Sequence, residues 1–173
     1  MQVSLLTTDR LVLRAPQLSD AHAVFAIDGD PQTNRFNPTG PDRSLDQSVR
    51  RLQRWLDHWR TYGFGYWVIT TRTRTETIIG MGGIMYREIA GAVRLNLYFR
   101  FRPAAWGQGY ATEMGRAAIA LGFSTLNQQQ IFATVRPNNH PSIRTLERLG
   151  LQHVDDIVDE QGVSRLYVLE RGA

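Results

Sequence analysis

The sequence predicts a mixed α/β fold, with several antiparallel strands followed by a strand–helix–strand crossover. Two observations carry this prediction. Short runs rich in β-branched and aromatic residues recur along the chain, and the stretches between several of them place apolar residues at helical spacing. No internal repeat or linker-like segment interrupts the 173 residues, so we expect one domain spanning residues 1–173.

The N-terminal part is predicted to contain a strand, a short helix and a loop. Residues 10–15 have the composition of a strand. Ser19 and Asp20 are expected to cap a helix over residues 21–28. Three prolines in the polar stretch 29–43 exclude a regular helix throughout that stretch. A loop of this length is usually functional or mobile.

A longer amphipathic helix is predicted after this loop. Ser44 and Gln47 form the pattern of a capping box, with Ser44 as the N-cap and the Gln47 side chain reaching back to it. Apolar residues then recur in steps of three and four, namely Leu45, Val49, Leu52, Trp55, Leu56, Trp59 and Tyr62. The aromatic members fit a core-facing stripe, and the exposed end of the stripe would also suit the wall of a substrate site.

The rest of the chain is predicted to hold six strands and two helices. The strands are expected over residues 65–71, 77–86, 93–102, 131–136, 151–158 and 164–169, and the helices over residues 107–123 and 141–149. Pro141 suits the first turn of the second helix, and Gly150 suits its left-handed C-terminal cap.

The composition excludes several kinds of site. The sequence contains neither cysteine nor lysine, which excludes disulfides, thiolate chemistry and a Schiff-base or P-loop lysine. The four histidines are not spaced as metal ligands, so no metal site is expected. No apolar run approaches the roughly 18 residues of a membrane span. The first seven residues lack the features of a signal peptide, so we expect a cytoplasmic protein with no membrane partner.

The net charge of +4 comes entirely from an excess of arginine over acidic residues, and it favours anionic ligands. Several arginines gather in the helix predicted after residue 44: Arg50, Arg51, Arg54 and Arg60. A solvated helix face explains them better than a nucleic-acid surface does, because the aromatic residues between them have core spacing.

Two motifs point to a phosphate-bearing ligand. Residues Trp106–Glu113 form a glycine-rich turn between a predicted strand and a predicted helix, an arrangement that leaves backbone N–H groups free to bind phosphate. Residues Asn138–Ser142, followed by Leu149-Gly150, form the second motif some thirty residues later.

These motifs resemble those of the GNAT superfamily of acetyl-CoA-dependent N-acetyltransferases. The resemblance covers nearly the whole chain and is greatest to the RimJ/RimL-type branch, which acetylates protein N-termini and, in many relatives, small amines. The strand start Thr8–Arg14 and the run Tyr66–Ile69 belong to it, together with both motifs. The resemblance implies a central mixed, mostly antiparallel sheet that splays at a parallel strand pair, with helices on both faces.

The resemblance also implies that acetyl-CoA is a co-substrate and that no metal is used. Backbone N–H groups of the first motif would hold the diphosphate, and the strand before it would pair with the pantetheine arm. The implied cofactor contacts are Tyr98, Phe99, Arg100, Trp106, Gly107, Gln108, Gly109, Tyr110, Ala111, Thr112, Asn139 and Ser142.

Three residues are candidates for catalysis. By resemblance, the Ser142 hydroxyl would protonate the leaving thiolate, and the backbone N–H near Phe99 would bind the thioester carbonyl. Asn96 stands where many relatives carry glutamate, so it can orient the amine or a water but cannot accept a proton. Plain helix capping is the alternative role for Asn139 and Ser142.

No replacement for the missing glutamate is evident. Glu88 and Asp28 are weaker candidates for the base, and Glu113 is better explained as a favourable charge in the first turn of a helix. A site without a strong base suits an amine of low pKa. At pH 7, neutralising an α-amine costs about 1.4 kcal/mol, whereas neutralising a lysine amine costs about 4.6 kcal/mol.

The expected function is therefore acetyl transfer from acetyl-CoA to a primary amine, either a protein N-terminus or a small molecule, directly in a ternary complex. The acceptor is expected near the loop 29–43, Trp55 and Trp59, the run Tyr62–Tyr66, and Tyr167, although core packing would also explain each of these residues.

The alternative is a non-catalytic module that binds CoA or RNA. An ordinary nucleotide-binding protein is disfavoured, because the chain lacks a Walker lysine and a full dinucleotide fingerprint. Nucleic acid is not an expected partner, and the sequence does not distinguish a monomer from a homodimer.

Overall fold

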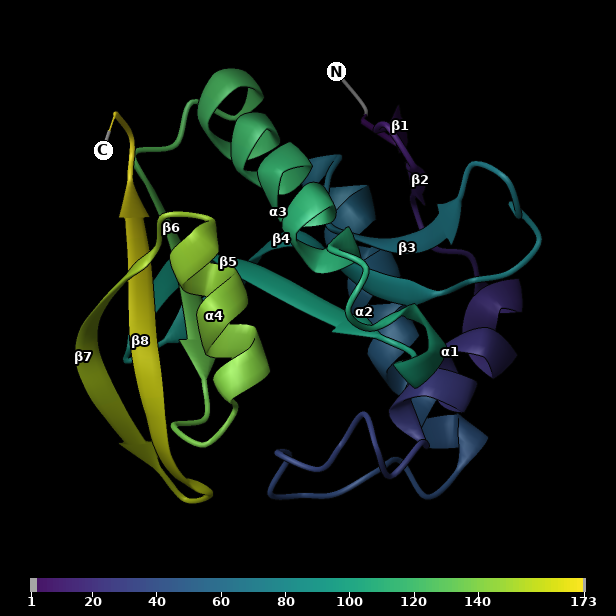
Figure 1. Cartoon of the computed structure of the whole chain (residues 1–173), viewed down its shortest axis with the longest axis horizontal. Coiled ribbons are helices and arrows are strands. Elements are labelled where there is room, and N and C mark those ends of the chain that lie inside the picture. Colours follow the sequence, from purple (N-terminus) through teal and green to yellow (C-terminus); the bar gives the residue numbers. More distant parts are fainter. Residues whose placement is uncertain (1–2, 173) are drawn as a thin grey trace.

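A computed structural model describes residues 3–172, which form one eight-stranded sheet and four α-helices (Figure 1). The strands are β1 (Leu5–Thr7), β2 (Leu11–Arg14), β3 (Tyr66–Thr71), β4 (Gly80–Ile89), β5 (Ala92–Phe101), β6 (Gln130–Val135), β7 (Gln152–Asp159) and β8 (Gly162–Glu170). The helices are α1 (Ala21–Asp28), α2 (Leu45–Tyr62), α3 (Tyr110–Ala120) and α4 (His140–Arg148).

The strand order in the sheet is β1-β2-β3-β4-β5-β6-β8-β7. Every neighbouring pair is antiparallel except β5 and β6, which are parallel and are joined through α3. The predicted mixed α/β fold with a central crossover is therefore confirmed. The three-residue strand β1 was not predicted, because it is too short to show an alternating pattern.

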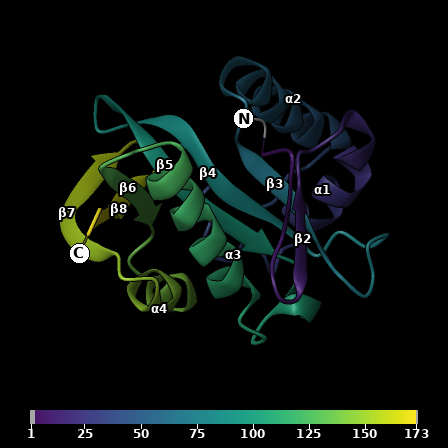
Figure 2. The ribbon, with the colours of Figure 1, turned by 90° about the horizontal axis from the view of Figure 1, so that it is seen from above.

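Helices cover both faces of the sheet: α3 and α4 lie on one face, and α1 and α2 lie on the other (Figures 1 and 2). The alternation along β3 explains how both faces are filled. Tyr66 and Val68 pack with the α1–α2 layer, whereas Trp67 and Ile69 pack in the α3–α4 layer. The Trp55 and Trp59 side chains of α2 are 4% and 8% exposed, which confirms the prediction that they belong to the core.

Ser44 and Asp20 occupy the N-cap positions of α2 and α1 as predicted, but neither makes the side-chain capping bond that the prediction implies. Ser44 makes no side-chain cap, and the Gln47 side chain accepts a hydrogen bond from the backbone N–H of Arg43 (2.5 Å) rather than from that of Ser44. The Asp20 carboxylate does not cap α1, because it accepts hydrogen bonds from the backbone N–H of Gln17 and from the guanidinium of Arg14. The Gln47 and Asp20 side chains instead bond residues that precede them by three to six positions, outside the helix that they were expected to cap.

The third helix also differs from its predicted span of residues 107–123. Gly107 and Gly109 adopt left-handed conformations (φ 74° and 78°), so α3 begins only at Tyr110. A turn of π-helix over Leu121–Thr125 follows its end. At the end of α4, Gly150 is left-handed (φ 93°) and the N–H of Leu151 bonds the Leu146 carbonyl, as the predicted C-terminal cap requires.

A buried histidine links α2 to the sheet. His58 Nδ1 lies 2.8 Å from the Phe64 carbonyl oxygen, and the backbone N–H of Tyr86 donates to His58 Nε2 at 3.1 Å. This pair of contacts requires the neutral ring with its proton on Nδ1. Burial lowers the pKa of His58, and the hydrogen bond to the Phe64 carbonyl offsets only part of that effect.

Across residues 3–172, none of the helices combines the length and the apolar character that crossing a bilayer requires.

Candidate functional site

The glycine turn at the start of α3 presents a row of free backbone N–H groups. Within residues 3–172, the N–H groups of residues 108–112 have no acceptor, and the first one engaged is that of Glu113, which donates to the Gly109 carbonyl (3.0 Å). Gly107 and Gly109, both in the left-handed conformation, form a turn directly before the first residue of α3. The positive end of the helix dipole adds to it, so the turn is suited to hold an anion.

Arg10 and Glu113 hold this turn against the N-terminal strands, and we call the pair the Arg10–Glu113 brace. Arg10 Nε donates to Glu113 Oε2 (2.7 Å), and Arg10 Nη1 donates to the Gln108 carbonyl (2.8 Å). The guanidinium also lies 4.7 Å from the centre of the Tyr110 ring. Sequence reasoning missed this brace and treated Glu113 only as a helix charge.

The Glu113 carboxylate has further partners. Its Oε1 accepts from Thr8 Oγ1 (2.6 Å) and from the backbone N–H of Arg10 (2.8 Å). Burial raises the pKa of Glu113, but the hydrogen bonds from Thr8 and Arg10 outweigh burial, and the net pKa is lowered. The carboxylate is therefore ionised at neutral pH and holds Arg10, whose guanidinium binds the Gln108 carbonyl of the turn.

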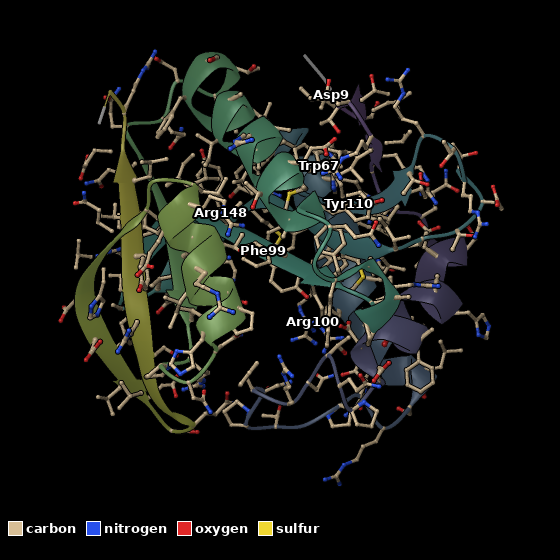
Figure 3. All side chains as sticks on the ribbon, viewed as in Figure 1. Asp9, Trp67, Phe99, Arg100, Tyr110 and Arg148 are labelled. Atoms are coloured by element: carbon tan, nitrogen blue, oxygen red, sulfur yellow. The ribbon has the colours of Figure 1, made fainter. Side chains whose placement is uncertain are left out.

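The backbones of β5 and β6 separate after a short parallel contact, and the opening between the two strands beyond that contact is here called the cleft. The two strands share a single register pair, Asn96 with Phe132, and β5 then continues to Phe101 without a partner on that side. Figure 3 places Phe99 between α3 and α4, and the next residue, Arg100, contacts Asp28 and Asn34 near the loop 29–43. The backbone of residues 98–100, which was predicted to bind the cofactor, therefore lines the gap.

Asn139 and Ser142 lie at the start of α4, beside the end of β6. Asn139 Oδ1 accepts a hydrogen bond from the backbone N–H of Ser142 (3.3 Å), so Asn139 is the N-cap of the helix. The capping role predicted as an alternative is confirmed for Asn139. The Ser142 side chain is half-buried, and its hydroxyl has no hydrogen-bond partner within residues 3–172.

Asn96 occupies the last paired position before the cleft. It is 2% exposed, and its Nδ2 donates to the Tyr66 hydroxyl at 2.7 Å. Its Oδ1 is buried and has no partner within the described residues. A buried acceptor without a partner is costly, so this atom is available to a water or to a bound amine.

The two weaker candidates for a base do not reach the cleft as free carboxylates. Asp28 is 1% exposed and forms ion pairs with Arg100 (3.0 Å) and with Arg51. Burial raises the pKa of Asp28 against the opposing pull of the two arginines. Glu88 is exposed and pairs with Val93, three residues before Asn96 on the side away from the cleft.

Asp28 is instead part of a buried ion network that fixes the loop 29–43. Arg51 also pairs with Asp42 (2.6 Å), at the end of this loop. Arg100 Nη1 donates to Asn34 Oδ1 (2.9 Å), and Asn34 Nδ2 donates to the Asp28 carbonyl (2.7 Å). The network therefore ties the loop to α1, α2 and β5, a role that the sequence did not reveal.

The remaining aromatic candidates for the acceptor site are mostly packed inside the protein. Tyr66 is 3% exposed and Tyr167 is 1% exposed, so neither forms an open wall. Tyr62, at the end of α2, is 51% exposed. Trp106 is 39% exposed, and its Nε1 donates to the Phe101 carbonyl (2.8 Å), which anchors the start of the glycine turn. Among residues 3–172, no three side chains of the metal-binding types come together.

Comparison with known proteins places these features in a family. The family model described as "Acetyltransferase (GNAT) domain" matches residues 10–152, a span that holds the glycine turn, the cleft and the start of α4. The chain is 28% identical over 169 residues to the uncharacterized N-acetyltransferase YoaA of Bacillus subtilis, covering 97% of this chain and 90% of that protein.

Solved structures share the fold. An acetyltransferase from Agrobacterium tumefaciens has a TM-score of 0.82 at 25% identity, covering 98% of this chain and 96% of that one. The ribosomal-protein-S5-alanine acetyltransferase from Vibrio fischeri has a TM-score of 0.74 at 18% identity, covering 97% of each chain. The spermidine N-acetyltransferase from Vibrio cholerae, in complex with CoA and spermine, has a TM-score of 0.74 at 18% identity, covering 94% and 96%.

Proposed function

Because the chain belongs to the GNAT acetyltransferase family and is an acetyltransferase, we propose that it moves the acetyl group of acetyl-CoA to a primary amine in a ternary complex. The observation that carries this proposal is the row of free N–H groups at residues 108–112, at the head of a helix beside the separating strands. No cysteine is present to form a covalent acetyl intermediate, so direct transfer is the simpler route.

In the proposed complex, the diphosphate of acetyl-CoA binds the N–H groups of the glycine turn. The pantetheine arm then follows the free edge of β5 past Arg100 and Tyr98, where its amides add to the sheet as an extra strand would. This path brings the thioester to the point where β5 and β6 separate. The N–H near Phe99 is proposed to bind the thioester oxygen and to stabilise the oxyanion.

The leaving thiolate needs little help. A thiol of pKa about 8.5 is a good leaving group at neutral pH, so a proton from the Ser142 hydroxyl contributes modestly. Since the Asn139 side chain already caps α4 through the Ser142 backbone, the Ser142 hydroxyl is left for this role. Asn139 is proposed to touch the pantetheine arm through the remaining capacity of its side-chain amide.

Asn96 is proposed to orient the amine or its attendant water through the unpartnered Oδ1, while the Tyr66 hydroxyl holds the amide in place. Because the Asn96 amide cannot take up the proton of the protonated amine, the amine must lose this proton to water. An amine with pKa near 8 then costs about 3 kcal/mol less to neutralise than a lysine amine. We therefore propose that the acceptor is an α-amine or another amine of low pKa, as in the RimJ/RimL-type branch. We also propose that the chain is a single domain and that the protein is cytoplasmic.

The test is acetyl-CoA-dependent thiol release with two peptide sets that differ only in the reactive amine. One set has a free N-terminus and no lysine, and the other has a blocked N-terminus and one internal lysine. We expect kcat/KM to be larger by on the order of a hundredfold for the free N-terminus at pH 7. Faster reaction of the lysine peptides would refute the choice of amine. Binding of acetyl-CoA without turnover of any amine would instead indicate a non-catalytic CoA-binding module.

A further inference from the structure

A cavity of about 430 Å³ opens between three segments that are distant in sequence. The loop 29–43 contributes Arg35 and Phe36, the turn after β6 contributes Arg136 and Asn138, and the β7–β8 hairpin contributes Gln161 and Val163. Figure 1 shows this loop, this turn and this hairpin gathered at one end of the molecule. The mechanism proposed above does not use the cavity.

The cavity adjoins both sequence motifs. Asn138 directly precedes the N-cap of α4. The Arg35 guanidinium lies 5.4 Å from the centre of the Trp106 ring, at the start of the glycine turn. Figure 1 shows β6 running toward this end of the molecule, while β5 runs away from it beyond the register pair of Asn96 with Phe132. A molecule in the cavity would therefore lie at the mouth of the cleft.

The lining of the cavity is positively charged. Neither aspartate nor glutamate lines it, and within residues 3–172 Arg35 has no carboxylate partner. The Arg35 guanidinium is held by stacking, 4.7 Å from the centre of the Phe36 ring, so its N–H groups stay free. An exposed guanidinium fixed on aromatic rings is well suited to meet a carboxylate or phosphate with two hydrogen bonds.

The second arginine is positioned by the hairpin. Arg136 Nη1 donates to the Val163 carbonyl (3.1 Å), and Nη2 donates to Gln161 Oε1 (3.3 Å). Its nearest carboxylate is that of Asp159 at 3.8 Å, which is 52% exposed and therefore screened by solvent. Asp159 therefore offsets only part of the positive potential of Arg136, whose guanidinium is held at the edge of the cavity.

We propose that this cavity receives an anionic group of the acceptor, so that the substrates are amines that also carry a carboxylate or phosphate away from the reacting nitrogen. This inference rests on the proposed acetyl transfer to an amine and adds the substrate class. A polyamine, which carries only positive charge, is repelled by Arg35 and Arg136. The spermidine acetyltransferase that shares the fold therefore differs from this protein in the charge of its acceptor.

The test compares two dipeptide amides, alanyl-glutamate amide and alanyl-glutamine amide, with spermidine as a third acceptor. The peptides share the same α-amine and nearly the same shape, and they differ in one carboxylate. We expect kcat/KM to be on the order of tenfold higher for the acidic peptide and lowest for spermidine. Arg35→Gln and Arg136→Gln should bring the ratio between the peptides close to one. Arg74→Gln, an exposed arginine in the β3–β4 turn outside the cavity, should leave the ratio unchanged.

Three results would overturn the inference. Equal kcat/KM for the two peptides, or preference for spermidine, would do so while leaving amine acetylation intact. The second result has two parts: Arg35→Gln leaves the ratio of kcat/KM between the two peptides unchanged, and it weakens the binding of CoA but not that of dephospho-CoA. This result would assign Arg35 to the 3′-phosphate of the cofactor. The third, no thiol release with any of the three amines, would overturn the inference together with amine acetylation, and acetyl-CoA calorimetry would then show separately whether the cofactor site stands.

Discussion

Replacing the Glu113 carboxylate by an amide should weaken acetyl-CoA binding, although the side-chain partners of Glu113 are Thr8 and Arg10 and not the proposed phosphate. Glu113 accepts hydrogen bonds from Thr8 Oγ1, from the Arg10 backbone N–H and from Arg10 Nε. Glu113→Gln keeps one carbonyl oxygen for the first two donors. It places an amide N–H₂ group against Arg10 Nε–H, so the bond between the two side chains is lost.

The size of the effect follows from the exposure of the pair. A hydrogen bond to a charged group contributes about 1.5–3 kcal/mol when well buried. The Arg10 side chain is 48% exposed, so solvent screening reduces its contribution to about 1 kcal/mol. A loss of about 1 kcal/mol lowers the equilibrium constant for the binding-competent turn by about fivefold. The apparent Kd for acetyl-CoA should then rise by roughly two- to fivefold, with the upper value reached when the competent turn is the minor conformation of the free protein.

Calorimetry with acetyl-CoA on the wild type and on Glu113→Gln measures this change. The matched control is Asp57→Asn, which replaces a carboxylate by an amide in the surface pair Asp57–Arg60, where the side chains are 58% and 68% exposed. Such a pair contributes little, so the control should bind as the wild type does. Unchanged affinity in Glu113→Gln, with both proteins folded, would refute the view that the brace prepares the turn.

Three further outcomes are expected. Ser142→Ala should lower kcat by about tenfold or less and leave acetyl-CoA affinity nearly unchanged in calorimetry, because the backbone cap to Asn139 remains; an equal loss of affinity would contradict the leaving-group role. The pKa of His58 is lowered in the folded state, so at a pH below the unfolded pKa of about 6.5 the protein takes up a proton when it unfolds. The contribution of the neutral His58 ring to the free energy of unfolding should therefore be complete above that pH and decrease below it. In thermal unfolding between pH 7.5 and 5.5, His58→Gln should therefore lose less stability than the wild type, and parallel curves would contradict the neutral ring. Arg51→Met should cost about 3–5 kcal/mol, seen as a Tm lower by roughly 10 °C, because it leaves the buried Asp28 without one of its partners; a Tm within about 2 °C would contradict the ion network.

Local patterns were sufficient to predict most elements of the fold. The apolar repeat between Leu45 and Tyr62 identified α2 over its full span, because the burial of one helix face dictates that spacing. The glycine-rich turn was predicted from Gly107 and Gly109, but the helix start was placed at Gly107, because the positive φ of both glycines is seen only in the structure. Its free N–H groups follow directly from that backbone. Both features depend only on residues within a few positions of one another in the chain.

Long-range pairing could not be predicted in the same way. The separation of β5 from β6 was expected only by resemblance, because the register of Asn96 with Phe132 depends on contacts spread over the sheet. Asp28 was predicted from the sequence only as a weaker candidate for the catalytic base. Its burial between Arg51 and Arg100 joins residues from α1, α2 and β5, and no local pattern marks such a network.

The segment before α3 connects the two halves of the proposed chemistry. On one side, Arg10 holds the carbonyl of Gln108 and stacks on Tyr110, which shapes the turn proposed to grip the diphosphate. On the other side, Arg35 stacks on Trp106, which places the loop 29–43 against the same turn. Trp106 is anchored in turn by its hydrogen bond to the end of β5. The site proposed for the cofactor and the cavity proposed for the acceptor therefore share one short segment, so a substitution at Trp106 should disturb both.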